Sequence, residues 1–315
     1  MKQVEDRLNK AIDLVQKRFD KNDANYCILV CAFFALLKKY DGEFFTILEN
    51  VFNKTNFVIE DKEMKFLLEE YGLINSVDDG IFIDSIKGVS MGCAYFDFYK
   101  DGKVYKEFGN SLVLCSKKDA SINTLLNTLI HEISHLIKGT INGYTYDEYN
   151  YFSMRTGFCT REVSFNNGEV VEREHYSILE EVVNTFQTSD MMMDIEFLKS
   201  IEVDDDLYQF LSLIDFSNLG AINGYGWSEY LIKDLWENEL FRNILEDEIV
   251  VGDIIKVINS FNEITGGDYF DEFADLLDDI DIEQDDEKLK DYIKRVREII
   301  SLFNSNRKEK VIIKK

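Results

Sequence analysis

The residues best suited to chemistry lie in one short segment, residues 128–139, with the sequence TLIHEISHLIKG. Two of the three histidines of the chain, His131 and His135, stand four positions apart, and Glu132 follows the first directly. An α-helix advances about 100° and about 1.5 Å per residue, so both imidazoles point to the same side, about 6 Å apart along the axis. The pattern H-E-x-x-H on a helix therefore predicts a Zn²⁺ site with two histidine ligands.

Glu132 is the predicted general base of this site. Zinc lowers the pKa of a bound water to about 7, and a carboxylate beside the metal can take its proton as that water attacks a carbonyl. The same carboxylate then passes the proton to the leaving amine. In the competing interpretation the histidines are ordinary helix residues and Glu132 is a solvated charge, but the motif and its helical context argue against it.

The segment has the features of a helix that positions an active site. Ser121 is a suitable N-cap, and Asp119 lies near the positive end of the helix dipole. Gly139 predicts a left-handed stop at the C-terminal end. A broad apolar surface, as a buried helix requires, is formed by Leu125, Leu126, Leu129, Ile130, Ile133, Leu136 and Ile137.

Composition narrows the class of protein. The chain has 315 residues, enough for a large core in one or two domains, and 45% of them are hydrophobic, as expected of a globular protein. Sixty acidic against 35 basic residues give a net charge of −25, which disfavours nucleic-acid binding because phosphates would be repelled. A neutral or basic peptide or protein is the more compatible partner.

Nothing near the start of the chain has the basic-then-apolar pattern of a signal peptide. The longest apolar run, residues 26–37, is too short to span a bilayer and predicts a buried helix. The five cysteines are odd in number and form no C-x-x-C pair, which favours free thiols in a reducing compartment. We therefore expect a cytoplasmic protein without a membrane span, although the sequence also allows export without a leader.

Apolar spacing predicts an α+β fold that is mainly helical, with a small mixed or antiparallel sheet before the H-E-x-x-H helix. We expect three consecutive parts: a helical region at 1–75, a sheet with the motif helix and a hairpin at 76–176, and a helical lobe at 177–315. The predicted strands are residues 80–86, 94–99, 104–108 and 111–116, with a second hairpin around residues 166–168. The strand at 111–116 leads into the motif helix and is predicted to hold an extended substrate by edge pairing.

A catalytic zinc takes three protein ligands and a water, so the motif leaves one ligand to be found. The longer pattern H-E-x-x-H-x-x-G-x-x-H fails, because Lys138 occupies the glycine position. With the later segment SILEEVVNTFQT at 177–188, the chain resembles the gluzincin branch of H-E-x-x-H metallopeptidases, over roughly residues 110–190. The resemblance implies that Glu181 completes the site. It departs from the family at Thr185, where an acidic residue often supports a ligand histidine, and Asn184 is a possible substitute.

Three other residues remain alternatives for the third ligand. They are Glu180, next to Glu181; Asp147, in a segment that loosely resembles the aspzincin branch; and His175, the remaining histidine, whose simpler interpretation is an exposed residue. Members of the resembled family also place a tyrosine or histidine donor beside the developing oxyanion. Tyr225, and beside it Tyr230, are candidates for that role by position alone, with packing as the default alternative.

The resemblance implies a zinc metallopeptidase of zincin-like fold that hydrolyses peptide bonds, with His131, His135 and Glu181 as ligands. A narrow-specificity protease, acting as a toxin or a regulator, is one alternative. A zincin-like protein that binds a peptide or protein partner without turnover is another, and the retained Glu132 argues against it. A closed structural zinc site is disfavoured because such sites prefer cysteine.

Overall fold

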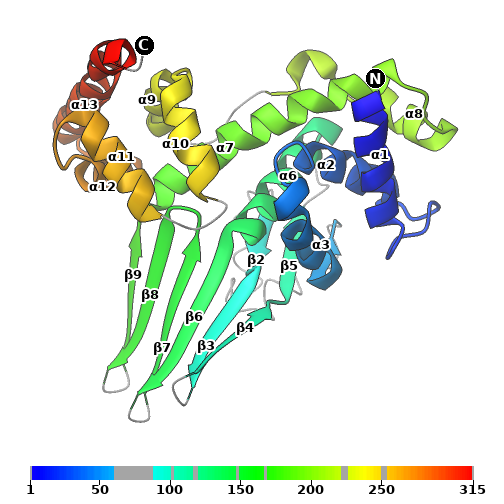
Figure 1. Ribbon diagram of the computed structural model, residues 1–315, viewed down its shortest axis with the longest axis horizontal. Helices are drawn as coiled ribbons and strands as arrows, with labels where there is room; N and C mark the ends of the chain where they lie inside the picture. Colours follow the sequence, from blue (N-terminus) through cyan, green and yellow to red (C-terminus); the bar gives the residue numbers. More distant parts are fainter. Residues whose placement is uncertain are drawn as a thin grey trace. The chain divides into compact units, whose positions relative to one another are not determined.

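The computed structural model describes residues 2–59, 88–100, 103–115, 120–146, 149–166, 169–220, 226–249 and 254–313 (Figure 1). The fold is mixed α+β, with more residues in helices than in strands, as expected from the sequence. The described residues form two mixed sheets instead of the one small sheet expected before the motif helix, and four strands of the larger sheet follow that helix. The chain divides into two compact units, each made of three separate segments. The first unit comprises Met1–Ala94, Phe108–Ile137 and Gln187–Ile222, and the second comprises Tyr95–Glu107, Lys138–Phe186 and Asn223–Lys315.

A three-stranded sheet lies in the first unit, in the order β1 (Thr55–Val58), β5 (Ser111–Cys115), β2 (Gly88–Met91). Strand β5 runs parallel to β1 and antiparallel to β2. All five residues of β5 are buried, as expected of an apolar strand with neighbours on both sides. The predicted edge pairing of a substrate with this strand is therefore wrong, because β5 is the central strand of the sheet.

Helices form most of the remaining described part of the first unit. Helix α2 (Tyr26–Leu36) is apolar on every side, and all of its residues except Cys27 are buried, which makes it the core helix of the unit. The rings of Phe33 and Phe52 meet edge to face with centroids 4.9 Å apart. The other helices that lie wholly in the described part of this unit are α1 (Lys2–Val15), α3 (Phe45–Lys54) and α8 (Asp205–Ser212), with 3-10 turns at Gly42–Phe44, Asp194–Ser200 and Phe216–Asn218.

The second unit is built on a six-stranded sheet whose order is β4-β3-β6-β7-β8-β9 (Figure 1). Strand β3 pairs with β6 in parallel, and from β6 to β9 each strand is antiparallel to the next. The strands are β3 (Tyr95–Lys100), β4 (Lys103–Phe108), β6 (Gly139–Tyr146), β7 (Tyr149–Thr156), β8 (Cys159–Asn166) and β9 (Glu169–His175).

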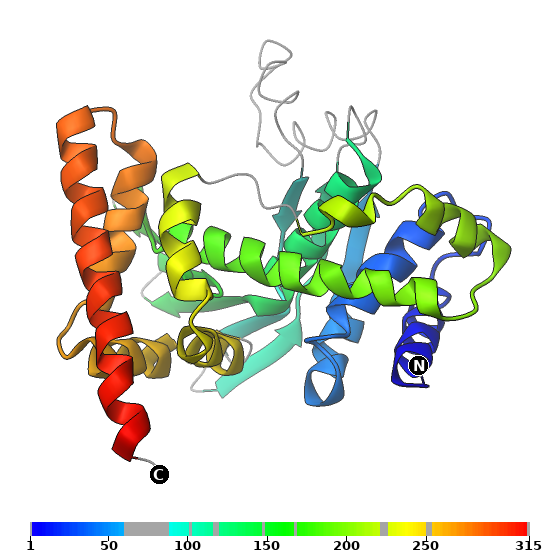
Figure 2. The same ribbon diagram turned by 90° about the horizontal axis from the view of Figure 1, so that it is seen from above.

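Helices α9 to α13 complete the second unit. They are α9 (Gly226–Trp236), α10 (Glu239–Ile249), α11 (Ile254–Thr265), α12 (Phe270–Ile282) and α13 (Asp286–Ile313), and Figure 2 shows the long α13 beside α12. Phenylalanines form the core between these helices, with the ring of Phe261 5.5 Å from that of Phe270 and 5.2 Å from that of Phe303. Each of these three rings is almost fully buried, so burial of aromatic surface holds the helices together.

Two helices carry the predicted metal ligands: α6 (Ile122–Lys138) and α7 (Ser177–Met193). The predicted cap of α6 is confirmed, since the Ser121 hydroxyl accepts a hydrogen bond from the Thr124 N–H at 3.1 Å. The predicted left-handed stop at Gly139 is wrong. Gly139 has no positive φ and begins β6, where it pairs with Thr156, so the chain passes from helix directly into extended strand.

Several predicted elements are found in the described residues. Strands β3, β4, β5, β8 and β9 match predicted strands. From Ser177 onward, all the regular elements in the described residues are helices, as predicted. Strand β1, in the region expected to be helical, and strands β6 and β7 were not predicted. The strand expected at 80–86 lies outside the described residues.

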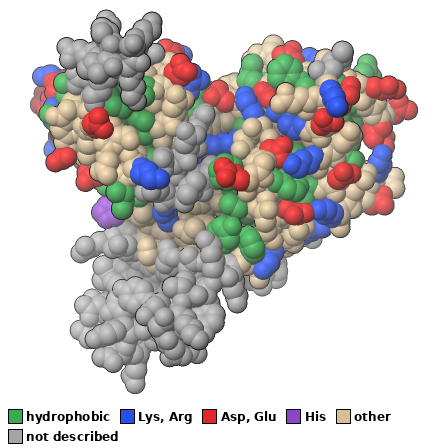
Figure 3. Space-filling model, viewed as in Figure 1, with side chains coloured by type: hydrophobic (Ala, Val, Ile, Leu, Met, Phe, Trp, Pro, Cys, Tyr) green, Lys and Arg blue, Asp and Glu red, His purple; other side chains and the backbone are tan. Residues whose placement is uncertain are grey.

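Acidic and basic side chains are interspersed over the face of the molecule shown in Figure 3. Across the described part of the chain, no helix combines the length and the apolar composition needed to cross a bilayer. All five cysteines are free thiols.

Candidate metal centre

The two histidines of the motif converge on one point beside α6. The Nε2 atoms of His131 and His135 lie 3.0 Å apart, and their rings are nearly perpendicular, at 82°. Two nitrogen ligands of a tetrahedral zinc, each about 2.05 Å from the metal, would be about 3.3 Å apart. The helix therefore holds the two nitrogens at almost the separation that a shared ion requires.

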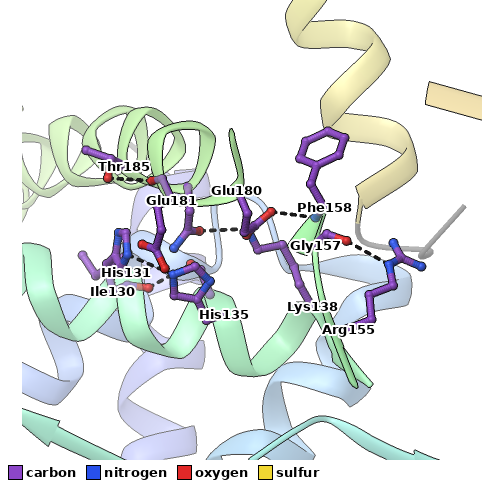
Figure 4. A network of polar contacts seen from close by, with 12 residues as sticks. Ile130, His131, His135, Lys138, Arg155, Gly157, Phe158, Glu180, Glu181 and Thr185 are labelled. Atoms are coloured by element: carbon purple, nitrogen blue, oxygen red, sulfur yellow. Dashed lines mark hydrogen bonds and ion pairs between the residues drawn. The ribbon is translucent and has the colours of Figure 1, made fainter. Parts of the chain in front are cut away.

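Glu181 supplies a carboxylate oxygen to the same place. The ligand atoms of His131, His135 and Glu181 all lie within 4.8 Å of one another. Figure 4 shows the Glu181 side chain extending from α7 toward the two rings on α6. His135 is buried, whereas the other two residues are half-buried. Two imidazole nitrogens and one carboxylate fit the donor set of a catalytic zinc, which keeps its fourth position for water or substrate.

The neighbouring Glu180 has a different set of partners. Its carboxylate forms an ion pair with the Lys138 ammonium, and both side chains are almost completely buried. Lys138 also donates to Asn184 Oδ1 at 3.0 Å. The second carboxylate oxygen of Glu180 accepts the backbone N–H of Phe158 at 2.9 Å (Figure 4). Glu180 is thus committed to a buried polar network, and Asn184, expected to support a ligand histidine, contacts Lys138 in that network.

This network joins the ends of the two helices that carry the candidate ligands. Lys138 is the last residue of α6, three positions after His135, and Glu180 immediately precedes Glu181 on α7. A buried charge is tolerated only when it is paired and hydrogen-bonded, so the ion pair resists any slip of one helix end past the other. The pair therefore helps to set the register in which Glu181 approaches the histidines.

A tight turn between β7 and β8 brings the Phe158 amide to Glu180. Gly157 has a φ of +55°, and a Cβ at this position would lie 1.9 Å from Glu180 Oε2. Only glycine adopts this conformation cheaply and leaves room for the carboxylate. The turn is closed by Arg155, whose Nε donates to the Gly157 carbonyl at 2.8 Å.

Glu132 lies on α6 beside the start of β2. A Cβ on Gly88 would be 2.1 Å from Thr128 Cγ2 and 3.2 Å from Glu132 Oε1. Glycine at this position lets the strand approach the helix closely and pass next to the half-buried carboxylate. Burial raises the pKa of the nearby Cys115 thiol, and the charge of Glu132 adds to that effect. Cys115 therefore stays a neutral thiol at physiological pH.

The first turn of α7 is held by a carboxylate from another helix. Asp278, on α12, accepts the backbone N–H groups of Tyr176 at 3.0 Å and Ile178 at 2.8 Å. Tyr176 has a φ of +61°, which is unfavourable for a residue with a side chain, and its hydroxyl donates to Asp271. These contacts satisfy N–H groups that have no partner within the helix and fix the start of the element that carries Glu181.

The other predicted site residues lie elsewhere or outside the described residues. His175 is an exposed residue at the end of β9, with its ring 6.0 Å from that of Tyr176. Tyr230 is exposed on α9, and its ring lies 6.0 Å from that of Trp227. Asp147 and Tyr225 fall outside the described residues, so their proposed roles as ligand and oxyanion donor stay predictions.

Sequence reasoning missed two residues that position the site. In the sequence, Lys138 only breaks the longer zinc motif, and a lysine in the last turn of a helix is ordinarily exposed, so no local signal marks it as the buried partner of Glu180. Asp278 belongs to the acidic stretch at residues 271–287, whose composition by itself indicates a solvated face or loop. No local pattern marks it as the residue that meets α7, because its partners are about 100 positions earlier in the chain.

Comparison with known proteins does not add a family to this picture. No family model, curated protein or solved structure matches the chain. The function must therefore be inferred from the motif and from the arrangement of the residues around it.

Proposed function

We propose that this protein is a zinc-dependent metallopeptidase of the gluzincin type, with His131, His135 and Glu181 as metal ligands. The observation that carries the proposal is the convergence of these three side chains within 4.8 Å. Glu181 lies 46 positions after His135, and their proximity is not implied by the spacing of the helix motif. Resemblance to gluzincins and the geometry of the side chains are two separate lines of support for the same ligand set.

Zinc is the metal best suited to this donor set, because two imidazoles and one carboxylate leave a fourth position open. Bound there, it would act as a Lewis acid and make a water acidic enough to lose its proton near neutral pH. A hard ion such as Mg²⁺ or Ca²⁺ would prefer oxygen ligands throughout. The two nitrogen donors therefore favour zinc over these ions.

Glu132 is the proposed proton carrier of the reaction. Its carboxylate accepts a proton from the attacking water while the water oxygen bonds to the carbonyl carbon of the peptide. The carboxylic acid of Glu132 then gives this proton to the amide nitrogen as the carbon–nitrogen bond breaks. The products are a carboxylic acid, which retains the second proton of the water, and an amine; near neutral pH they exchange that proton and become a carboxylate and an ammonium group. The close approach of Gly88 to Glu132 supports a fixed position for the carboxylate during both transfers.

An extended peptide is the proposed form of the substrate. Among the described strands of the first unit, β2 pairs only with β5, and it begins at the glycine beside Glu132. A substrate strand could add to this edge through backbone hydrogen bonds. Such pairing would bring successive peptide carbonyls past Glu132, which is the geometry that the proposed chemistry requires.

Cleavage of a peptide library, followed by mass spectrometry, tests the proposal. The zinc-loaded wild type should generate new amino termini, and the zinc-loaded Glu132→Gln variant should not. Removing zinc with a chelator should abolish cleavage, and adding zinc back should restore it. A zinc-loaded wild type that cleaves no library peptide would instead favour the alternative of a partner-binding protein without turnover.

A further inference from the structure

A shallow hollow on the second unit collects positive charge in a chain that is otherwise strongly acidic. It has a volume of about 590 Å³ and lies between α13 and the first turn of α9. Its lining includes Lys290, Lys294 and Arg297 on α13, together with Trp227 on α9. One carboxylate, that of Glu298, also lines it, and this carboxylate is paired with Arg295 at 3.2 Å, so the three cations outnumber it. We name this feature the cationic hollow.

The three cations of the hollow form no ion pair within the described part of the chain. Their positions, i, i+4 and i+7, place them on one face of α13, where neighbouring like charges repel one another. Carboxylates outnumber cations by 60 to 35, and the nearby Arg295 is paired with both Glu272 and Glu298. Three adjacent cations that have no ion pair with any described residue are thus unusual in this chain, and an anionic ligand would relieve their repulsion.

Apolar surface accompanies the charge. Trp227 is 51% exposed and forms a wall of the hollow, while the buried Ile293 lies at its base. Tyr230 is also exposed, and the Arg297 guanidinium lies 5.9 Å from the centre of its ring. Exposed tryptophan, tyrosine and arginine side chains are enriched among residues that dominate protein–protein binding energy.

We propose that the cationic hollow docks an acidic segment of a partner protein. Carboxylates of the segment would meet Lys290, Lys294 and Arg297, and one apolar side chain would lie against Trp227. This inference does not depend on the metallopeptidase proposal, since it rests on a different surface and a different set of residues.

Charge complementarity selects a peptide over other anionic partners. A nucleic acid or an anionic membrane extends beyond the hollow and would meet the repulsion of a chain with net charge −25. A short peptide segment can place its carboxylates within the hollow alone. The apolar wall at Trp227 adds a contact that a peptide side chain can make and that a free phosphate cannot.

Fluorescence anisotropy of a labelled peptide tests the proposal on the full-length protein. The probe is a short peptide with glutamates flanking one phenylalanine, and its control has glutamine in place of each glutamate. The acidic peptide should bind saturably and more weakly as salt is added, and the glutamine peptide should bind far more weakly. Absence of saturable binding, or equal binding of the two peptides, would overturn the proposal.

Matched variants locate the binding site. Lys294→Glu should weaken binding about fivefold or more, whereas Lys233→Glu, an equal charge change at an exposed site on α9, should have little effect. Trp227→Ala should weaken binding about tenfold, and Tyr208→Ala, at another exposed aromatic residue, should not. If the two variants of either matched pair weakened binding equally, the result would contradict the proposal that the peptide binds in the cationic hollow.

Two further experiments distinguish an acidic peptide from the other possible ligands of the cationic hollow. Tighter binding of a labelled single-stranded oligonucleotide, or of phosphatidylserine vesicles, than of the acidic peptide would overturn the peptide proposal. Self-association of the wild type in analytical ultracentrifugation, lost in Lys294→Glu, would identify a second copy of this chain as the occupant and would also overturn it.

Discussion

Glu180 and Glu181 are adjacent on α7, yet their carboxylates have different partners. Glu180 forms a buried ion pair with Lys138, and Glu181 lies with His131 and His135 in the candidate metal centre. Consecutive residues of a helix point about 100° apart, so one helix turn presents one carboxylate to the interior and the other to the histidines. The two glutamates therefore have separable roles, and the buried pair positions the candidate ligand Glu181.

The first prediction concerns the buried ion pair. Glu180→Gln should lower the free energy of unfolding by about 3–5 kcal/mol, because it leaves the Lys138 ammonium buried without a counter-charge. The double variant Lys138→Met/Glu180→Gln should be more stable than Glu180→Gln, since it removes that charge and keeps an acceptor for the Phe158 amide. Urea unfolding of both single variants and the double variant measures the coupling energy. Additive effects of the two substitutions would contradict the role given to the pair.

The second prediction concerns the turn that meets Glu180. Gly157→Ala and Gly42→Ala introduce a side chain at similar positive φ values, +55° and +61°. A Cβ at Gly42 meets nothing within 4 Å, so its cost should be the backbone strain alone, about 1–2 kcal/mol. Gly157→Ala adds a clash with the Glu180 carboxylate and should cost about 1–3 kcal/mol more. Thermal or urea unfolding compares the two variants, and equal destabilisation would show that the turn does not press on Glu180.

The third prediction is a pH dependence. Burial raises the pKa of the Asp278 carboxyl, although the backbone N–H groups of Ile178 and Tyr176 oppose this shift. Because the folded protein then holds the proton more tightly than the unfolded chain, this group stabilises the fold as pH falls through the raised pKa. The gain is complete below the unfolded value of about 3.9.

Asp278→Asn removes this titration and retains an oxygen that accepts a hydrogen bond. The difference in unfolding free energy, wild type minus Asp278→Asn, should therefore rise as pH is lowered from about 7 to about 4. Urea unfolding of the metal-free proteins at several pH values measures that difference. Carboxyl groups distant from Asp278 cancel in it, whereas Asp275, whose charge acts on Asp278, contributes to it. A difference that stays constant, or falls, would mean that Asp278 is not held in a buried position at the start of α7.

The fourth prediction separates chemistry from metal binding. Glu132→Gln should reduce peptide hydrolysis by about 10²–10⁴-fold, because the amide cannot accept the proton of the attacking water. Zinc content should equal that of the wild type, since Glu132 is not one of the three proposed ligands. Activity is measured on a peptide cleaved by the wild type, with zinc determined in the same samples. Wild-type activity in Glu132→Gln would remove Glu132 from its proposed role.

Local patterns in the sequence predicted the elements that have strong local signals. The motif helix follows from the apolar period and from the Ser121 cap, and the strands β8 and β9 follow from the turn residues between them. Strands β6 and β7 were missed because their own segment, residues 139–156, is rich in tyrosine, asparagine and glycine and has no clear alternation of apolar and polar residues. Strand β1 was missed because it is only four residues long and follows α3 directly, so it is too short to show an alternating pattern of its own.

The candidate ligands that lie on one helix could be predicted from the sequence. The candidate ligand that comes from a second helix was harder to predict. The spacing of His131 and His135 fixes their common direction, so these two residues could be chosen from the sequence alone. The choice between Glu180 and Glu181 depended on resemblance to a family, because either residue can face the metal if α7 is rotated. The rotation is set by partners far away in the chain, Lys138 and Asp278, which no local pattern links to α7.

The most direct test of the central claim is the zinc content of purified protein, measured by elemental analysis after zinc loading and removal of excess metal. The wild type and Glu132→Gln should each hold close to one zinc per chain. His135→Ala and Glu181→Gln should lose it, with affinity reduced more than about 100-fold, since loss of a ligand should exceed the loss of a supporting contact. Full zinc content in Glu181→Gln, or a wild type that binds no zinc after loading, would contradict the proposed centre.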